Sequence, residues 1–113
     1  MAKYLLLMYG KEMKMPRNPT KAMMEAGVKP WMDYLGPLSK KKVLESSAPV
    51  GWNGKMLTAK GGAKSYRAEK VDLVGYMLIK AKSPAEAMKI AKRSPHAVAG
   101  MGHTVIRECM DVM

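Results

Sequence analysis

The apolar positions of the chain gather in two short, nearly unbroken runs, residues 3–9 (KYLLLMY) and residues 73–79 (LVGYMLI). Apolar residues at consecutive positions over this length are typical of strands that are covered on both faces. Residues 104–112 (TVIRECMDV) alternate imperfectly and predict a third, more polar strand. These runs therefore predict a sheet that needs cover on both of its sides.

A helix with clear boundary signals follows the second apolar run. Ser83 can accept a hydrogen bond from a free N–H at the helix start, Pro84 suits the first helical position, and Glu86 completes a capping box. Lysine and arginine gather toward its end, and Pro95 marks the stop. Residues 73–95 therefore predict a strand followed by a helix.

An earlier stretch has helical spacing but contains two prolines. Apolar residues recur at spacings of four and three, at Met24, Val28, Trp31, Leu35 and Leu38. Thr20 can cap this stretch, and residues 11–19 before it read as a loop. We expect a helix over residues 21–41, broken or bent near Pro30 and Pro37, because proline removes a helical hydrogen bond.

The middle of the chain predicts a hairpin. Residues 43–52 and 55–60 flank Asn53-Gly54, the pair that favours a type I′ turn, and Pro49 favours a sheet edge. Gly61-Gly62 closes this segment. We expect residues 63–72 to form a loop with a short extended piece at Ser65-Tyr66, and residues 97–103 to form a second loop.

The order of these elements predicts an α+β fold. Strand, helix, hairpin, strand, helix and strand give the ferredoxin-like split β-α-β plan with an extra β-hairpin and an antiparallel sheet, in a single domain over residues 1–113. Two helices cover one face of such a sheet, yet the strands are apolar on both faces. We therefore expect a homodimer with the two sheets face to face, a dimeric α+β barrel.

Charge and cysteine content narrow the function classes. The 20 Lys and Arg against 9 Asp and Glu give a net charge of +11, which favours anionic ligands or nucleic acid, or only keeps the protein in solution. A single cysteine, Cys109, fits a reducing cytoplasm and excludes zinc sites built from several cysteines. On its strand, Cys109 is expected to pack inside or half inside the fold. No apolar run reaches the length of a membrane span, so we expect a cytoplasmic protein without a membrane partner.

The candidate site residues are one histidine, a set of aromatic residues and two cations. His103 comes directly before the last strand, where a side chain can point into a barrel mouth, and it is the candidate catalytic residue; His96 is read as an ordinary loop histidine. The spacing of the two histidines lacks the pattern of a metal site, and no cofactor fingerprint is present. The residues expected to bind a ligand are Tyr9, Trp31, Tyr34, Tyr76, Lys64 and Arg67.

Four segments together resemble the YCII-related family, in particular its DGPF-type branch: KYLLLMYG, WMDYL, VGYMLIKAKSPAEAMKIAKRSP and GHTVIRECMDV. The resemblance covers nearly the whole chain and implies a dimeric α+β barrel. The segment that corresponds to DGPF stands here as Ala63-Lys64-Ser65-Tyr66, so only its aromatic position is kept. The chain also has no His on the first predicted helix or near the first strand. The resemblance therefore transfers no His–Asp pair of the kind associated with lyase-like or dehalogenating chemistry.

Three functions remain open at this point, and the residues define no reaction. The first is binding of a small molecule in a barrel cavity, with an anionic ligand favoured by the net positive charge. The second is a basic nucleic-acid-binding module, with Trp52 beside Asn53-Gly54 available to stack on a base. The third is a dimerisation module without chemistry of its own.

Overall fold

The computed structural model describes residues 1–12 and 17–111. Part of the loop expected over residues 11–19 and the last residue of the strand expected over 104–112 lie outside the described residues. The elements, in chain order, are β1 (Ala2–Gly10), α1 (Lys21–Lys40), β2 (Leu44–Pro49), β3 (Asn53–Leu57), β4 (Ala63–Arg67), β5 (Asp72–Ala81), α2 (Pro84–Lys92), α3 (Pro95–Val98) and β6 (Thr104–Glu108).

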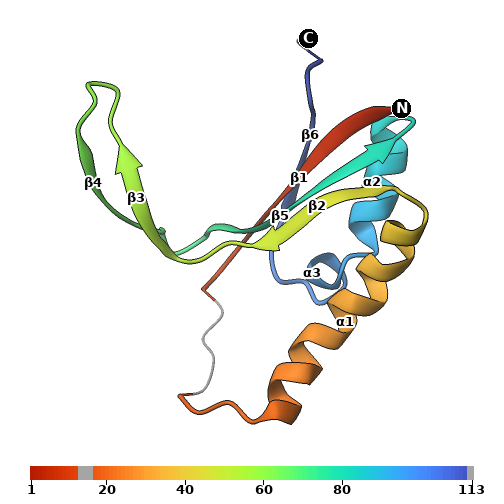
Figure 1. Ribbon diagram of the computed structural model, residues 1–113, viewed down its shortest axis with the longest axis horizontal. Coiled ribbons are helices and arrows are strands. Elements are labelled where there is room, and N and C mark those ends of the chain that lie inside the picture. The colour runs from red at the N-terminus through yellow and green to blue at the C-terminus, as the bar shows by residue number, and fades with distance from the viewer. Residues whose placement is uncertain (13–16, 112–113) are drawn as a thin grey trace.

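The main sheet has four antiparallel strands in the order β2-β5-β1-β6. The first strand lies in the centre, between β5 and β6, and the α1 and α2 crossovers connect the strands. This is the strand order of the ferredoxin-like fold, so the predicted fold class is confirmed. Figure 1 shows the three helices on one side of this sheet.

The core lies between the sheet and the helices. Alternate residues of β1 and β5 point to it, and the most deeply buried side chains are Leu6, Met77 and Ile79. Ala87 and Ala91 of α2 cover them from the helix side. The intervening residues of β1 and β5 point to the opposite face of the sheet, which none of the helices in the described part of the chain covers.

Both long helices begin where the sequence predicts. The Ser83 hydroxyl accepts a hydrogen bond from the Glu86 N–H at 3.2 Å, and the Thr20 hydroxyl accepts one from the Met23 N–H at 3.1 Å. A break in the first helix was the wrong expectation, because α1 is one continuous helix that contains both Pro30 and Pro37. A bend near either proline stays a prediction. Both prolines are exposed, so the carbonyl groups that lose a helical partner can bond to water.

Among the described residues, the second half of the α1 apolar stripe packs against the core and the first half is largely exposed. Trp31, Leu35 and Leu38 pack against the core, whereas Met24 and Val28 are 49% and 55% exposed. The first turns of α1 extend past the sheet (Figure 1). Apolar periodicity therefore located the helix correctly but overstated how much of it the chain covers.

The predicted turn at Asn53-Gly54 was wrong. Both residues lie inside β3, which pairs with β4 and not with β2, and the turn lies at residues 58–62, where Gly61 has φ +90°. β2 pairs instead with β5, as an edge strand that ends at Pro49. Residues 63–67, expected to be mostly loop, form β4. We call the β3–β4 hairpin with its turn, residues 53–67, the arm.

Two smaller expectations near the end of the chain also need correction. The loop expected over residues 97–103 begins in a short helix, α3, capped by Ser94, whose hydroxyl accepts from the Ala97 N–H at 3.2 Å. Cys109, expected to be a packing residue, is exposed. Its N–H donates to the Lys3 carbonyl at 2.9 Å, so the backbone pairing of β6 with β1 continues past the strand end.

Among the described residues, no helix is long and apolar enough to cross a membrane.

Candidate functional site

The candidate site lies at the end of β1, where Tyr9 and His103 stack on one another. The two ring centroids are 4.9 Å apart and the ring planes differ by 8°. The Tyr9 N–H also donates to the His103 carbonyl at 2.9 Å. Side chain and backbone together therefore fix His103, the predicted candidate, against the central strand of the sheet.

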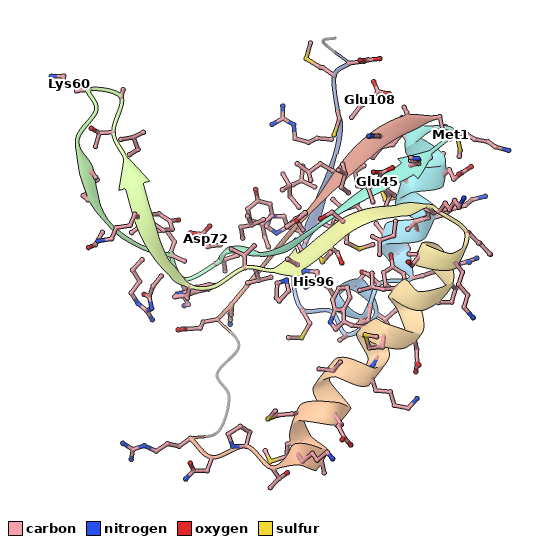
Figure 2. All side chains as sticks on the ribbon, viewed as in Figure 1. Met1, Glu45, Lys60, Asp72, His96 and Glu108 are labelled. Atoms are coloured by element: carbon pink, nitrogen blue, oxygen red, sulfur yellow. The ribbon has the colours of Figure 1, made fainter. Side chains whose placement is uncertain are left out.

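His96 holds the same tyrosine from the other side. It lies on α3 with only 6% of its surface exposed, and its Nε2 is 3.1 Å from the Tyr9 carbonyl oxygen. A carbonyl oxygen only accepts hydrogen bonds, so Nε2 carries the proton and donates. The sequence offered no sign of this role, because 87 residues separate the two partners. Figure 2 labels His96 below the sheet, on the helix side.

The backbone around Tyr9 is irregular in two ways that shape the site. The register between β1 and β5 shifts between Met8 and Tyr9, and such bulges often re-aim a side chain beside a functional site. The loop before β6 approaches β1 closely: a Cβ on Gly102 would lie 1.9 Å from the Tyr9 carbonyl oxygen, and one on Gly10 would lie 2.8 Å from the Met101 carbonyl oxygen. Because Gly10 and Gly102 have no Cβ, β1 and the loop before β6 can lie this close together.

A hollow of about 490 Å³ opens where these segments meet. Its size falls in the range of small-molecule sites. The residues that line it are Gly10, Lys11, Glu12, Val71, Gly100, Met101, Gly102 and His103. Sequence reasoning found His103 but missed Lys11 and Glu12. Their position directly after a buried strand was the available signal.

Glu12 links this hollow to the arm. Its Oε1 accepts a hydrogen bond from Arg67 Nη2 at 3.0 Å, and Arg67 Nη1 donates to Asn53 Oδ1 at 2.9 Å. Arg67, predicted as an anion contact, is therefore engaged by a carboxylate of the same chain. Lys64 is exposed farther along the arm.

The structure separates the predicted aromatic set into two groups. Tyr76 shares the open face of the sheet with Tyr9, and its hydroxyl is 2.8 Å from Ser46 Oγ. Trp31 and Tyr34 lie in the helix layer with their rings edge to face, 6.0 Å apart. The Tyr34 hydroxyl donates to the Ile90 carbonyl at 2.7 Å, and burial raises the pKa of Tyr34 to about 12. The sheet therefore lies between the two groups.

The open face of the sheet is apolar in its middle and charged at one end. Leu5, Leu7, Tyr76 and Leu78 form cross-strand neighbours on β1 and β5 and are only partly covered. At the end where β1 begins, Glu45 accepts from Lys80 at 2.9 Å and lies 3.9 Å from Lys3. The bond from the Lys80 ammonium, with the charge of Lys3, lowers the pKa of Glu45.

The basic residues counted between positions 40 and 70 do not form one patch. Lys40, Lys41 and Lys42 lie at the end of α1, before β2, whereas the arm lies beyond the other end of β2 (Figure 1). Trp52 lies at the root of the arm, while Figure 2 shows Lys60 at its tip. This arrangement weakens the case for a nucleic-acid-binding surface.

Two other kinds of site have less support in the structure. A depression of about 430 Å³ is lined by residues of α1 and the adjoining Lys41, so it lies along a single helix without an opposing wall. Within residues 1–12 and 17–111, no three His, Cys, Asp or Glu side chains are placed to hold a metal ion.

Asp72 fixes the root of the arm and gives a testable pH dependence. Its Oδ2 accepts from the Tyr66 hydroxyl at 2.5 Å and from the Glu69 N–H at 3.0 Å, and its Oδ1 accepts from the Leu73 N–H at 2.7 Å. The Tyr66 bond, followed by the two backbone bonds, lowers the pKa of Asp72. The same contact raises the pKa of Tyr66.

Because the pKa of Asp72 is lower in the folded state than in the unfolded state, its stabilising effect is complete above the ordinary Asp pKa of about 3.9. That effect is lost as the pH falls through the folded pKa. We expect Asp72→Asn to lower the urea midpoint near pH 6, and the gap from the wild type to narrow near pH 3. Asp33→Asn, at an exposed carboxylate bonded to Lys29, is the matched control. A gap that stays constant with pH would contradict this role of Asp72.

Comparison with known proteins identifies the fold. No family model and no curated protein matches the chain. Among solved structures, it is similar to 5-chloro-2-hydroxyhydroquinone dehydrochlorinase from Burkholderia phenoliruptrix AC1100, in complex with 2,5-dihydroxybenzoquinone. The match has a TM-score of 0.53 and 16% sequence identity, and covers 96% of this chain and 93% of that chain. The chain thus shares its α+β fold with that dehydrochlorinase.

Proposed function

We propose that this protein binds a small organic molecule in the hollow at the end of β1. The observation that carries the proposal is the Tyr9–His103 stack beside a hollow of about 490 Å³. A flat aromatic wall favours a planar ligand, and an imidazole can donate or accept a hydrogen bond. Lys11 supplies a positive charge in the same lining, which favours an anionic or phenolic group.

The likeness to a dehydrochlorinase that holds 2,5-dihydroxybenzoquinone supports this ligand class through the fold alone. The proposal extends to binding and assigns no reaction. We also propose that the chain is a cytoplasmic member of the YCII-related family, DGPF-type branch, as a single domain. The fold and the order of the quoted motifs support that placement.

We further propose that the protein is a homodimer with the open sheet faces in contact. A compact monomer of 12.5 kDa exposes about 6,200 Å² by the scaling of surface with mass, whereas this chain exposes 8710 Å². Its radius of gyration is 15.9 Å, against about 13 Å for a compact chain of this length. The excess surface, about 2,500 Å², exceeds the roughly 800 Å² that each partner buries in a standard interface.

The binding proposal is tested by calorimetry with 2,5-dihydroxybenzoquinone as the probe. We expect the wild type to bind it and His103→Ala to weaken binding about tenfold or more, because one wall of the hollow is lost. Trp31→Phe is the control, since Trp31 lies across the sheet in the helix layer. Native mass spectrometry of the protein as purified reports any ligand already bound.

Equal affinities in the wild type and His103→Ala would count against a site at this place. A loss in Trp31→Phe that matches the loss in His103→Ala would move the site to the helix layer. Absence of both probe binding and a bound adduct would contradict the proposed ligand class.

A further inference from the structure

The arm is largely uncovered by the rest of its own chain. Almost every residue of β3 and β4 is exposed, and Leu57 and Met56 are 76% and 38% exposed. A two-stranded hairpin on its own is only marginally stable in water. The root is fixed by the Tyr66–Asp72 and Arg67–Glu12 contacts, but these do not cover the outer part of the arm. This outer part needs a surface to pack on.

The arm continues the ribbon formed by β2 and β5. The Val50 N–H donates to the Val74 carbonyl, and the Ala68 N–H donates to the Trp52 carbonyl, each at 2.9 Å. Pairing therefore continues through the bend, and the arm keeps a defined direction. It curves away on the side of the sheet opposite the helices (Figure 1). Figure 2 shows Asp72 at its root and Lys60 at its tip. The arm therefore extends on the same side of the molecule as the open sheet face.

The length of the arm determines whether it can reach a second sheet that packs on the open face. Stacked sheets are about 10 Å apart, and a five-residue strand spans about 17 Å. An arm that rises from the edge of one sheet is therefore long enough to run alongside a second sheet packed on the open face. The arm carries Lys55, Lys60, Lys64 and Arg67 and no acidic residue, so repulsion disfavours the pairing of one arm with another.

We propose that the arm is a clasp between subunits. In the homodimer, each arm passes the edge of the second copy's sheet and packs its outer apolar side chains, Leu57 among them, against that copy. This inference rests on the proposed homodimer and extends it. The excess surface of about 2,500 Å² is enough for a sheet-to-sheet contact and for the arms as well.

The dimer dissociation constant, measured by sedimentation across a dilution series, tests the clasp. We expect Leu57→Glu to raise the constant about tenfold, because a charge enters a contact that was apolar. Val98→Glu is the matched control: Val98 is 75% exposed, like Leu57 at 76%, but lies on α3 on the helix side. We expect it to leave the constant unchanged. A second variant replaces residues 54–66 with a two-residue turn between the register partners Asn53 and Arg67 and should weaken the dimer further.

Cross-linking gives an independent measurement on the unaltered chain. Dimers are mixed from unlabelled and ¹⁵N-labelled protein and treated with an amine-reactive cross-linker. We expect links from Lys55, Lys60 or Lys64 that join a labelled chain to an unlabelled one.

If both arm variants dimerise like the wild type, or if the arm lysines link only within a chain, the clasp is wrong and the sheet-to-sheet dimer stands. A wild type that is monomeric at every concentration overturns both. An altered arm that keeps its dimer but loses salt-sensitive binding to nucleic acid overturns the clasp in favour of a polyanion-binding arm.

Discussion

Gly102→Ala should destabilise the protein by about 3 kcal/mol or more and lower its melting temperature by about 10 °C. Gly102 has φ +153°, a conformation that side chains rarely adopt. Its new Cβ would lie 1.9 Å from the Tyr9 carbonyl oxygen and 2.9 Å from the carbonyl carbon. Neither backbone can move without disturbing the hydrogen bond from the Tyr9 N–H to the His103 carbonyl. The measurement is thermal unfolding followed by circular dichroism.

Two other glycines separate this clash from the general cost of losing a glycine. Gly100→Ala also places a side chain at positive φ, +65°, but into open space, so we expect a loss of only about 1 kcal/mol. Gly27→Ala lies inside α1 with no atom near the new Cβ and should stabilise the protein by up to about 1 kcal/mol. Equal melting temperatures for Gly102→Ala and the wild type would contradict the close contact between this loop and β1.

Leu7→Glu should convert the proposed homodimer to a monomer in the micromolar range, a change of at least about 100-fold in the dissociation constant. Leu7 lies at the centre of the open face, opposite Tyr76 on β5 and Val105 on β6. A carboxylate enclosed there without a partner costs about 3 kcal/mol or more, and the symmetric dimer would contain two. In the separate subunit, Leu7 is only partly covered, so the fold should survive the change. Sedimentation measures the mass, and circular dichroism checks the fold.

Leu7→Met is the matched control for this substitution, since it keeps the apolar character and nearly the volume of the side chain. It should retain the dimer with a dissociation constant close to that of the wild type. If Leu7→Glu remains a dimer of unchanged affinity, the subunits associate through another surface, and the open face has a different occupant.

The predicted strands and helices were most accurate where local signals and burial agreed. Ser83 and Thr20 cap their helices as expected, and the two apolar runs form the two central strands. Asn53-Gly54 misled because its turn preference is local, whereas β2 gains a non-local partner in β5. Gly54 instead lies within β3 opposite Tyr66, and a Cβ at this position would contact the Tyr66 ring.

The candidate site was predictable in part, because two of its residues lie at the ends of predicted strands. Tyr9 and His103 both lie at strand ends, and strands place their end residues together once the sheet order is known. Trp31 was grouped with Tyr9 because the sequence does not say on which side of a sheet a helix packs. Lys11 and Glu12 had no pattern of their own, and their place in the hollow depends on contacts with residues 71 and 100–103. Tertiary contacts of this kind are not encoded in any local spacing.

The central position of β1 also determines when the sheet can form during synthesis. β1 precedes both of its partners, β5 and β6, along the chain, and the Tyr4 hydroxyl donates to Glu108, 104 residues later. Folds dominated by such distant contacts form slowly. Until residues 72–81 have left the ribosome, the apolar run of β1 has no strand beside it. The nascent chain therefore carries an unpaired, aggregation-prone strand from the synthesis of β1 until that of β5, and its yield in cells should depend on chaperone supply.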